Sequence, residues 1–356
     1  MARRLRRRLV GLVALVLLAA LSALGWLLLV YARTPLPGPR EHVVVELPSR
    51  GPREVASALA AAGVIETPTA FAVYLRVRGV ADRLRDGSVL LATGLSPREV
   101  ARRITRGQHG MPVRVTIPEG LHRFEIAERL EAQGICSREA FLDASAEPPE
   151  GVQGALTAEG YLFPDTYDFH PGSDPETVVS RMVANFRRRT DELWNAQRNE
   201  LRALQRDLNY GPHQVLTLAS VVEEEAAVSE ERAVIAGVFL NRLRSETFRP
   251  LHRLQADPTV SYGCLERRSE APSCAVFAGR LSRAMLNDPA NPYNTYRHGG
   301  LPPGPITNPG LESLRAVLRP AQHNYLYFVA RGGGRHEFSE ALDQHNDAVD
   351  RHLRSD

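Results

Sequence analysis

The stretch Leu218-Ala-Ser-Val-Val-Glu-Glu-Glu-Ala226 joins an apolar run to three consecutive acids, and the pattern predicts a helix over 214–227. At about 100° per residue, the apolar side chains of this helix share one face. Glu225 falls inside that face, Glu223 falls on its border, and Glu224 points to the opposite side. Three adjacent acids on a helix usually form a solvated face, so the Glu225 carboxyl, which lies among Leu and Val, is unusual.

A carboxyl in apolar surroundings loses hydration, and acidic neighbours repel its charge, so both effects raise its pKa. A glutamic acid that stays protonated near neutral pH can act as a general acid. We therefore predict Glu225 as the catalytic acid and give Glu223 a supporting role. The alternative is a structural acid that is buried in an ion pair with an arginine.

The segments around this helix predict a mixed α and β domain. Asp174-Pro-Glu has the cap and first-turn proline of a helix that ends near Asn209, and Ser229 opens a further helix. Residues 325–330 and 336–339, on either side of a glycine-rich turn, indicate a β-hairpin.

An internal repeat precedes this domain. Val43-Val-Val-Glu-Leu-Pro48 and Val113-Arg-Val-Thr-Ile-Pro118 each lead, after the same interval, to Phe71 and Phe141. Each copy predicts a strand, a turn, an amphipathic helix, a glycine stop and a second short helix. The copies are therefore expected to be small α/β modules.

Consecutive prolines within 145–151 break both periodic patterns and mark the expected start of the large domain. The expected fold class is α+β, with a single N-terminal transmembrane helix ahead of the small modules and the catalytic domain. The predicted parts are a basic tail (1–8), a transmembrane helix (9–31), a proline-rich stalk (32–42), one or more N-terminal modules (43–112), a second module (113–150) and the large domain (151–356).

The predicted transmembrane helix follows a cluster of arginines. Five of the first eight residues are Arg, and the next 23, from Leu9 to Tyr31, carry no charge. A helix of that length reaches about 35 Å against a hydrocarbon core of about 30 Å. The positive-inside rule puts the N-terminus in the cytoplasm and the rest of the chain outside, at the inner membrane. The alternative is a cleavable signal peptide.

Charge and composition exclude several classes of protein. The formal net charge is only +3 over 356 residues, and all 44 basic residues are Arg. The chain as a whole therefore lacks the strong positive electrostatic potential that is typical of nucleic-acid binding. The 11 histidines do not form a His-Glu-x-x-His pattern, and no metal site is predicted. Cys264 and Cys274 bracket a short polar stretch that a disulfide could close in an exported protein. Free thiols are the alternative.

Polar, turn-rich loops follow the acidic helix. Side-chain amides, hydroxyls and tyrosine rings on such loops suit a sugar, because ring faces stack and hydroxyl or N-acetyl groups form hydrogen bonds. The alternative is that the proline and glycine runs only shape loops. The substrate-binding candidates are Gln255, Asp257, Thr259, Tyr262, Tyr293, Asn294, Thr295, Tyr296 and Asn308.

Several long motifs, in order, resemble the endolytic murein transglycosylases of the MltG or YceG-like type. Besides the acidic helix, they include Thr116-Ile-Pro-Glu-Gly120, Glu159-Gly-Tyr-Leu-Phe-Pro-Asp-Thr-Tyr167, Phe239-Leu-Asn-Arg-Leu243, Leu254-Gln-Ala-Asp-Pro-Thr259, Tyr293-Asn-Thr-Tyr296, Gly300-Leu-Pro-Pro-Gly304 and Tyr325-Leu-Tyr-Phe-Val329. The last acid of the family's Glu-Lys-Glu triplet falls on Glu225. Glu224 replaces the usual Lys, and the stretch between Cys264 and Cys274 differs from the family pattern.

The resemblance implies LysM-like small modules and a lyase that uses no cofactor. Such an enzyme cleaves the β-1,4 bond between N-acetylmuramic acid and N-acetylglucosamine in nascent peptidoglycan and leaves 1,6-anhydro ends. The implied partners are glycan strands, peptidoglycan synthases (penicillin-binding proteins) and the membrane. The rival interpretation is a non-catalytic tether that binds peptidoglycan, with a structural role for Glu225.

Overall fold

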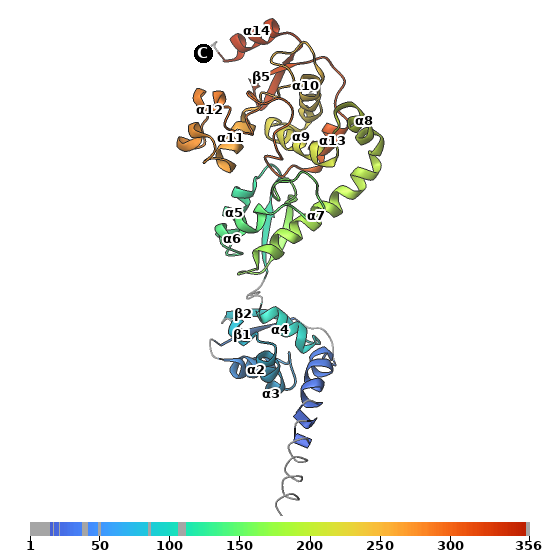
Figure 1. Cartoon of the computed structure of the whole chain (residues 1–356), viewed down its shortest axis with the longest axis vertical. Coiled ribbons are helices and arrows are strands. Elements are labelled where there is room, and N and C mark those ends of the chain that lie inside the picture. The colour runs from blue at the N-terminus through green and yellow to red at the C-terminus, as the bar shows by residue number, and fades with distance from the viewer. Residues whose placement is uncertain are drawn as a thin grey trace, which may run out of the picture. The chain divides into compact units, whose positions relative to one another are not determined.

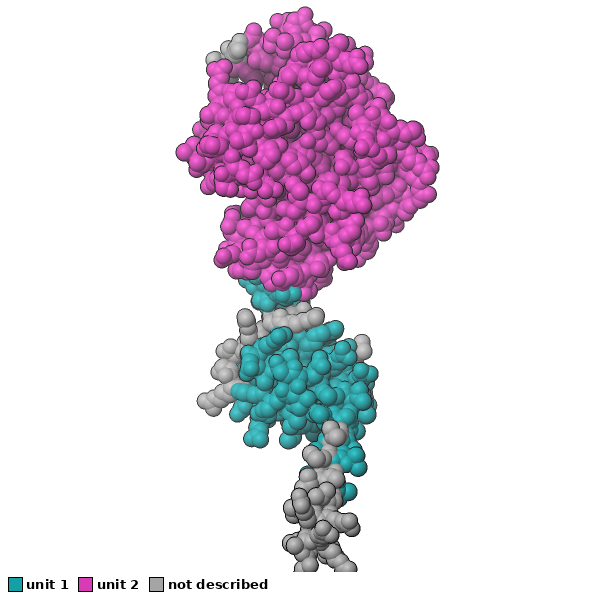
Figure 2. All heavy atoms as spheres, in the orientation of Figure 1, with its two compact units in different colours: residues 1–114, 133–136, 168–174 teal, residues 115–132, 137–167, 175–356 magenta. Residues whose placement is uncertain are grey.

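The computed structural model describes residues 15–37 except 17 and 21, and residues 42–48, 51–84, 87–105 and 112–353. The chain divides into two compact units, coloured separately in Figure 2. The first comprises residues 1–114, 133–136 and 168–174, and the second comprises residues 115–132, 137–167 and 175–356.

The first unit contains one βααβ arrangement followed by a further helix. β1 pairs antiparallel with β2, with Val45 opposite Val89. Val55, Leu59, Phe71 and Leu75 project from the two helices into one buried core. The elements are β1 (His42–Leu47), α2 (Pro52–Ala61), α3 (Pro68–Val77), β2 (Gly87–Ala92) and α4 (Pro97–Thr105), with short 3-10 turns at Tyr31–Arg33 and Ala81–Arg83.

The same order of elements recurs. It comprises β3 (Val113–Ile117), α5 (Arg123–Ala132), α6 (Arg138–Ala146) and β4 (Asp165–Phe169), and β3 pairs with β4. The repeated strand, helix and short helix agree with the sequence repeat, and Phe141, like Phe71, is fully buried. We expected a boundary at 145–151, but the strand that pairs with β3 lies beyond it. The second βααβ arrangement therefore extends past residue 151.

The turn between β3 and α5 is tied to a distant loop. The Gly120 amide donates to the Asn308 carbonyl at 3.0 Å, and the Asn308 amide donates to the Leu121 carbonyl at 3.1 Å. These two bonds hold the first helix of the second βααβ arrangement against the large domain.

The large domain is mostly helical (Figure 1). Its elements are α7 (Pro175–Ala196), α8 (Arg198–Leu208), α9 (Pro212–Glu225), α10 (Arg232–Arg244), α11 (Asp257–Glu266), α12 (Arg283–Asn287), α13 (Leu311–Leu318), β5 (Tyr327–Gly332), β6 (Arg335–Ser339) and α14 (Leu342–Leu353), with 3-10 turns at Ser229–Glu231 and Pro272–Val276. β5 and β6 form the predicted hairpin. The single helix expected from residue 174 to 209 is two helices, because Gln197 leaves helical geometry at φ −113° and ψ 33°.

α9 is the central helix of this domain and contacts α10, α11 and α13. Every residue from Val215 to Val222 is buried, including Thr217 and Ser220. The helix is therefore not amphipathic as we expected, because neighbouring elements cover it on all sides. Its acids begin where the helix leaves the core.

Among the described residues, no helix is both long and apolar enough to cross a bilayer. The basic tail 1–8 lies outside the described residues. The transmembrane helix predicted over 9–31 also falls partly outside them, at residues 9–14, 17 and 21.

Candidate active site

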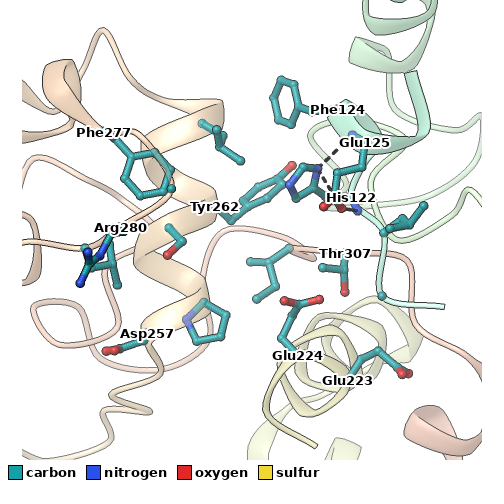
Figure 3. A pocket seen from close by; sticks show the side chains of 18 of the residues that line it. His122, Phe124, Glu125, Glu223, Glu224, Asp257, Tyr262, Phe277, Arg280 and Thr307 are labelled. Atoms are coloured by element: carbon teal, nitrogen blue, oxygen red, sulfur yellow. Dashed lines mark hydrogen bonds and ion pairs between the residues drawn. The ribbon is translucent and has the colours of Figure 1, made fainter. Parts of the chain in front are cut away.

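A cavity of about 1300 Å³ lies at the carboxyl end of α9 (Figure 3). One wall comes from the β3–α5 turn and α5, another from α11, and a third from the loop 277–281. The last turn of α9 and residues 306–307 also line it. Segments that lie far apart in the sequence thus meet around one cavity.

Glu224 lines this cavity and extends into it (Figure 3). Partial burial, followed by the Glu125 and Glu223 carboxylates, raises the pKa of Glu224 to about 7. The helical wheel points Glu224 away from the apolar face, and in the structure this residue is exposed to the cavity. The β3–α5 turn lines the same cavity and brings Gly120 beside the Glu224 carboxylate.

Glu223 has three close partners. Its carboxylate lies 2.9 Å from Arg232 Nη2 and accepts hydrogen bonds from the Gly310 amide at 3.1 Å and the Ser313 hydroxyl at 2.7 Å. Only 6% of its side chain is exposed. The cation and the two donors fix the Glu223 carboxylate in place, and these contacts tie α9 to α10 and α13.

Glu225 lines a separate cavity of about 390 Å³, together with Arg242, Tyr327 and His345. Burial, followed by the Asp257 carboxylate, raises the pKa of Glu225 to about 7, and the Arg242 guanidinium opposes the rise. Glu225 is also the last residue of α9, where the negative end of the helix dipole disfavours a carboxylate. Within the described part of the chain, its carboxyl makes no hydrogen bond or ion pair, so it is available to a ligand.

Arg242 is a cation held in an aromatic enclosure behind Glu225. The rings of Phe248, Phe328 and Phe239 lie 5.1, 5.6 and 5.7 Å from the guanidinium carbon. Its guanidinium donates to the Leu326 carbonyl at 2.7 Å and to the Leu254 carbonyl. Burial lowers the pKa of Arg242 to about 10, while Glu225 opposes this. Three rings and two carbonyls thus fix this charge in place.

Asp257 and Tyr296 connect the cavities. Asp257 lines both the larger cavity and the Glu225 cavity. The Tyr296 hydroxyl donates to Asp257 Oδ1 at 2.6 Å, and Tyr296 lines the Glu225 cavity beside Gln255. Gln255 has a φ of 54°, a left-handed conformation that costs an L residue roughly 1–2 kcal/mol. Three sequence candidates, Gln255, Asp257 and Tyr296, therefore come together beside Glu225.

Other sequence candidates lie in the interior. The Thr295 hydroxyl accepts from the Ala256 amide at 3.0 Å and lies 2.9 Å from the Thr259 hydroxyl. The Asn294 amide donates to three carbonyls, one of them that of Asp288 at 2.9 Å. The described cavities are not lined by these side chains, which hold the loop of Tyr296 in place.

Asn308, Tyr293 and Tyr262 complete the sequence candidates. Asn308 is fully buried, and its side chain accepts from the Leu162 amide at 2.8 Å and donates to Glu159 at 2.6 Å. Tyr293 is 3% exposed and its ring lies 5.1 Å from that of Tyr262. Only Tyr262 of the three lines the larger cavity, where its ring packs against His122 and Phe124.

A buried ion pair, absent from the sequence predictions, joins two walls of the larger cavity. Arg123 on α5 lies 2.6 Å from Glu266 on α11, with 9% and 8% of the side chains exposed. Glu159 accepts from the Arg123 amide at 2.9 Å, and burial raises the pKa of Glu159 to about 8. Arg123 lies outside the family motifs, and Glu266 lies in the stretch between the two cysteines without a predicted role, so only the three-dimensional arrangement identifies the pair.

The third wall rests on a disulfide. Cys264 and Cys274 are bonded, and their Cα atoms are 4.9 Å apart. Phe277 and Leu281, which line the larger cavity, pack in the same apolar cluster. The cross-link therefore supports the loop 277–281. Among the described residues, no group of three or more His, Cys, Asp or Glu side chains is arranged to hold a metal ion.

Known proteins are similar to this chain in sequence. Residues 45–351 match the YceG-like family. The endolytic murein transglycosylase of Bacillus subtilis (strain 168) is 30% identical over 318 residues, which cover 85% of this chain and 82% of the relative. That of Streptococcus pneumoniae serotype 2 (strain D39) is 27% identical over 383 residues, covering 96% of this chain and 64% of its own length.

The fold also resembles a solved structure. The crystal structure of a yceG-like protein from Listeria monocytogenes superposes with a TM-score of 0.53 at 28% identity, covering 87% of this chain and 99% of the other. The family match extends over most of the chain, through both βααβ arrangements and the acidic helix. The chain belongs to the YceG-like family.

Proposed function

We propose that the protein is an endolytic lytic transglycosylase that cleaves the β-1,4 bond between N-acetylmuramic acid and N-acetylglucosamine in peptidoglycan. The names of the relatives support this activity. The observation that carries the proposal is the carboxyl of Glu225, which faces a cavity without a protein partner and has a pKa raised to about 7.

The proposed reaction uses one carboxyl twice. Glu225 in its protonated form donates a proton to the glycosidic oxygen as the bond to C1 of the muramoyl residue breaks. As a carboxylate, it then takes the proton of the muramoyl 6-hydroxyl, whose oxygen bonds to C1 and closes the 1,6-anhydro ring. No water is consumed, and the intramolecular nucleophile makes a second catalytic carboxyl unnecessary.

Neighbouring charges suit both steps. The Asp257 carboxylate favours the protonated Glu225 that the first step needs, and the Arg242 guanidinium favours the carboxylate that the second step needs. A general acid works best when its pKa lies near the operating pH, because both forms are then accessible. A pKa of about 7 meets this condition.

Glu224 is the alternative acid. It is adjacent in sequence, faces the larger cavity, and has a pKa that is also raised to about 7. We assign the reaction to Glu225 because it faces the fixed cation Arg242, which can stabilise the carboxylate formed in the first step. Glu224 has only acids among the charged groups that shift its pKa.

We also propose the location and the partners. Residues 9–31 would anchor the chain in the inner membrane with a cytoplasmic N-terminus, as the Arg cluster and the uncharged stretch indicate. The βααβ arrangements would act as LysM-like modules on the glycan. Anchoring would keep the enzyme beside penicillin-binding proteins, where cleavage ends strand elongation.

The deciding experiment is product analysis. Purified protein is incubated with peptidoglycan glycan strands, and the products are examined by mass spectrometry. Strands with 1,6-anhydromuramoyl ends are expected from the wild type and not from Glu225→Gln. Reducing ends in place of anhydro ends would identify a hydrolase instead. Binding of glycan by the wild type without cleavage would identify a tether.

A further inference from the structure

A third cavity, of about 360 Å³, has an unusual concentration of positive charge. Its charged residues are Arg253, Arg283 and Arg297, and the remaining lining residues are Pro250, Gln255, Leu286, Asn287 and Tyr296. No carboxylate is among these lining residues. The larger cavity also has three arginines (Arg138, Arg268 and Arg280), but it has six acids beside them: Glu119, Glu125, Glu128, Glu223, Glu224 and Asp257. Three cations without a lining acid favour an anionic ligand.

This arginine cavity adjoins the Glu225 cavity. Gln255 and Tyr296 line both of them. A ligand that occupies the Glu225 cavity can therefore extend a substituent into the arginine cavity. The shared residues are also well fixed, since the Gln255 amide donates to the Thr295 carbonyl at 3.3 Å and Tyr296 is bonded to Asp257.

The three arginines differ in how many hydrogen bonds their guanidinium groups make to the protein. Arg253 Nη1 donates to the Tyr296 carbonyl at 2.5 Å, and Arg297 Nε donates to the Asn287 carbonyl at 3.0 Å. Both bonds orient a guanidinium whose other N–H groups remain for a ligand. The Arg283 guanidinium has no hydrogen bond or ion pair to the described residues. Guanidinium groups bind carboxylates through paired N–H donors, so this set suits a carboxylate.

We propose that the arginine cavity is a binding subsite for a carboxylate on the peptide stem of the substrate. The inference rests on the proposed function, since the stem is attached to the muramoyl residue that would occupy the Glu225 cavity. The subsite selects strands that carry a charged stem and positions the muramoyl residue beside the acid. Gln255 supplies a side-chain amide beside the guanidinium groups, which suits a peptide ligand, while the Asn287 amide donates to the Arg283 carbonyl at 2.8 Å.

The test measures equilibrium binding, so it does not depend on cleavage. Full-length protein is titrated with a disaccharide–tetrapeptide, with the same fragment after amidation of its carboxyl groups, and with the peptide-free disaccharide. Arg283→Gln should weaken binding of the charged fragment about three- to tenfold, the range expected for a partly exposed charge pair. It should leave the Kd of the other two fragments unchanged.

The matched control is Arg206→Gln, which removes the same charge from an exposed position on α8 outside these cavities. It should leave all three affinities unchanged. Salt should weaken the wild type's preference for the charged fragment more than that of Arg283→Gln. Inorganic pyrophosphate is titrated as a further probe, because a phosphate group could bind the same guanidinium groups in place of the stem carboxylate.

The outcomes separate the two proposals. Equal affinity of the wild type and Arg283→Gln for the charged fragment would overturn the subsite. So would a loss of affinity of Arg283→Gln for the peptide-free disaccharide that is as large as its loss for the charged fragment. If Arg283→Gln lost only pyrophosphate binding, the cavity would recognise phosphate and not the stem. A wild type that discriminates between the fragments through Arg283 but produces no anhydro ends would keep the subsite and reject the transglycosylase.

Discussion

The hydroxyl of Tyr296 donates a hydrogen bond of 2.6 Å to Oδ1 of Asp257 and holds that carboxylate at the boundary of two cavities. Asp257 is thereby a fixed negative neighbour of Glu225. It raises the pKa of Glu225, whereas Arg242 lowers it. The acid, its two charged neighbours and the tyrosine come from three helices and a loop, and their arrangement leads to the following predictions.

Glu225→Gln should abolish cleavage while it preserves the fold. Glutamine keeps the size of the side chain and removes the proton that is transferred, and general acid–base groups contribute about 10²- to 10⁴-fold. The loss should lie at the upper end of this range, because one residue serves two steps. The rate of formation of anhydro ends measures it, and circular dichroism checks the fold. Glu224→Gln is the matched control; if it were the inactive variant, the acid would be Glu224.

The neighbours of Glu225 should shift the pH profile in opposite directions. The first step needs protonated Glu225, so kcat/KM should fall as pH rises through about 7. Asp257→Asn removes a repelling carboxylate, lowers the pKa of Glu225, and moves this fall to lower pH. Arg242→Gln removes a stabilising cation, raises the pKa, and moves the fall to higher pH.

Arg242→Lys is the control for this pair of shifts, because it keeps the charge. Its pH profile should stay close to that of the wild type. Shifts in the same direction for Asp257→Asn and Arg242→Gln would contradict the assignment of opposing roles.

Glu266→Gln should destabilise the protein by about 3 kcal/mol, since removal of one partner leaves the buried Arg123 guanidinium without its counter-charge. Urea unfolding followed by fluorescence measures the loss. Asp207→Asn is the comparison, because the Asp207–Arg244 pair is 47% and 40% exposed and should be worth less than about 1 kcal/mol. Equal effects of the two substitutions would show that the Arg123 pair does not stabilise the two walls.

Loss of the disulfide should lower stability and activity together. A Cys264→Ala/Cys274→Ala double variant should lose about 2–3 kcal/mol, because the unfolded chain regains the freedom of a ten-residue loop. Its KM for glycan should rise, because Phe277 and Leu281 pack in the same cluster. Non-reducing peptide mapping should recover the two cysteines as one linked peptide from the wild type, and separate peptides would refute the bond.

The anchor proposal has its own test. Mature protein should sediment with the membrane and retain residue 1, because the uncharged stretch 9–31 is long enough to span a bilayer. Cell fractionation and N-terminal sequencing measure this. A mature protein that begins at Arg33 in the soluble fraction would indicate a cleaved signal peptide.

The sequence predicted local features better than tertiary ones. The interval from Pro48 to Phe71 and from Pro118 to Phe141 predicted two strand–helix–helix segments, because local periodicity and breakers determine them. The closing strand β4 was not predicted, since its five residues take their pairing from β3, far back in the chain. Local patterns do not report such partners.

The candidate site shows the same division. Asp257 and Tyr296 could be singled out as polar groups on ordered loops, and both reach the Glu225 cavity. Asn294 and Thr295 had the same appearance in sequence, but their polar atoms bond to the protein itself. Arg242 lies within a family motif, but the sequence does not predict its role, because its aromatic enclosure is assembled from three separate segments.

The paired backbone bonds between the β3–α5 turn and Asn308 bear on where the chain can be cut. A truncated protein that began at residue 151 would lose β3, α5 and the partners of the Asn308 amide and carbonyl. It would also lack one wall of the larger cavity. The smallest autonomous form of the enzyme should therefore start ahead of Val113, and the second βααβ arrangement is an integral part of the catalytic body, not a detachable accessory.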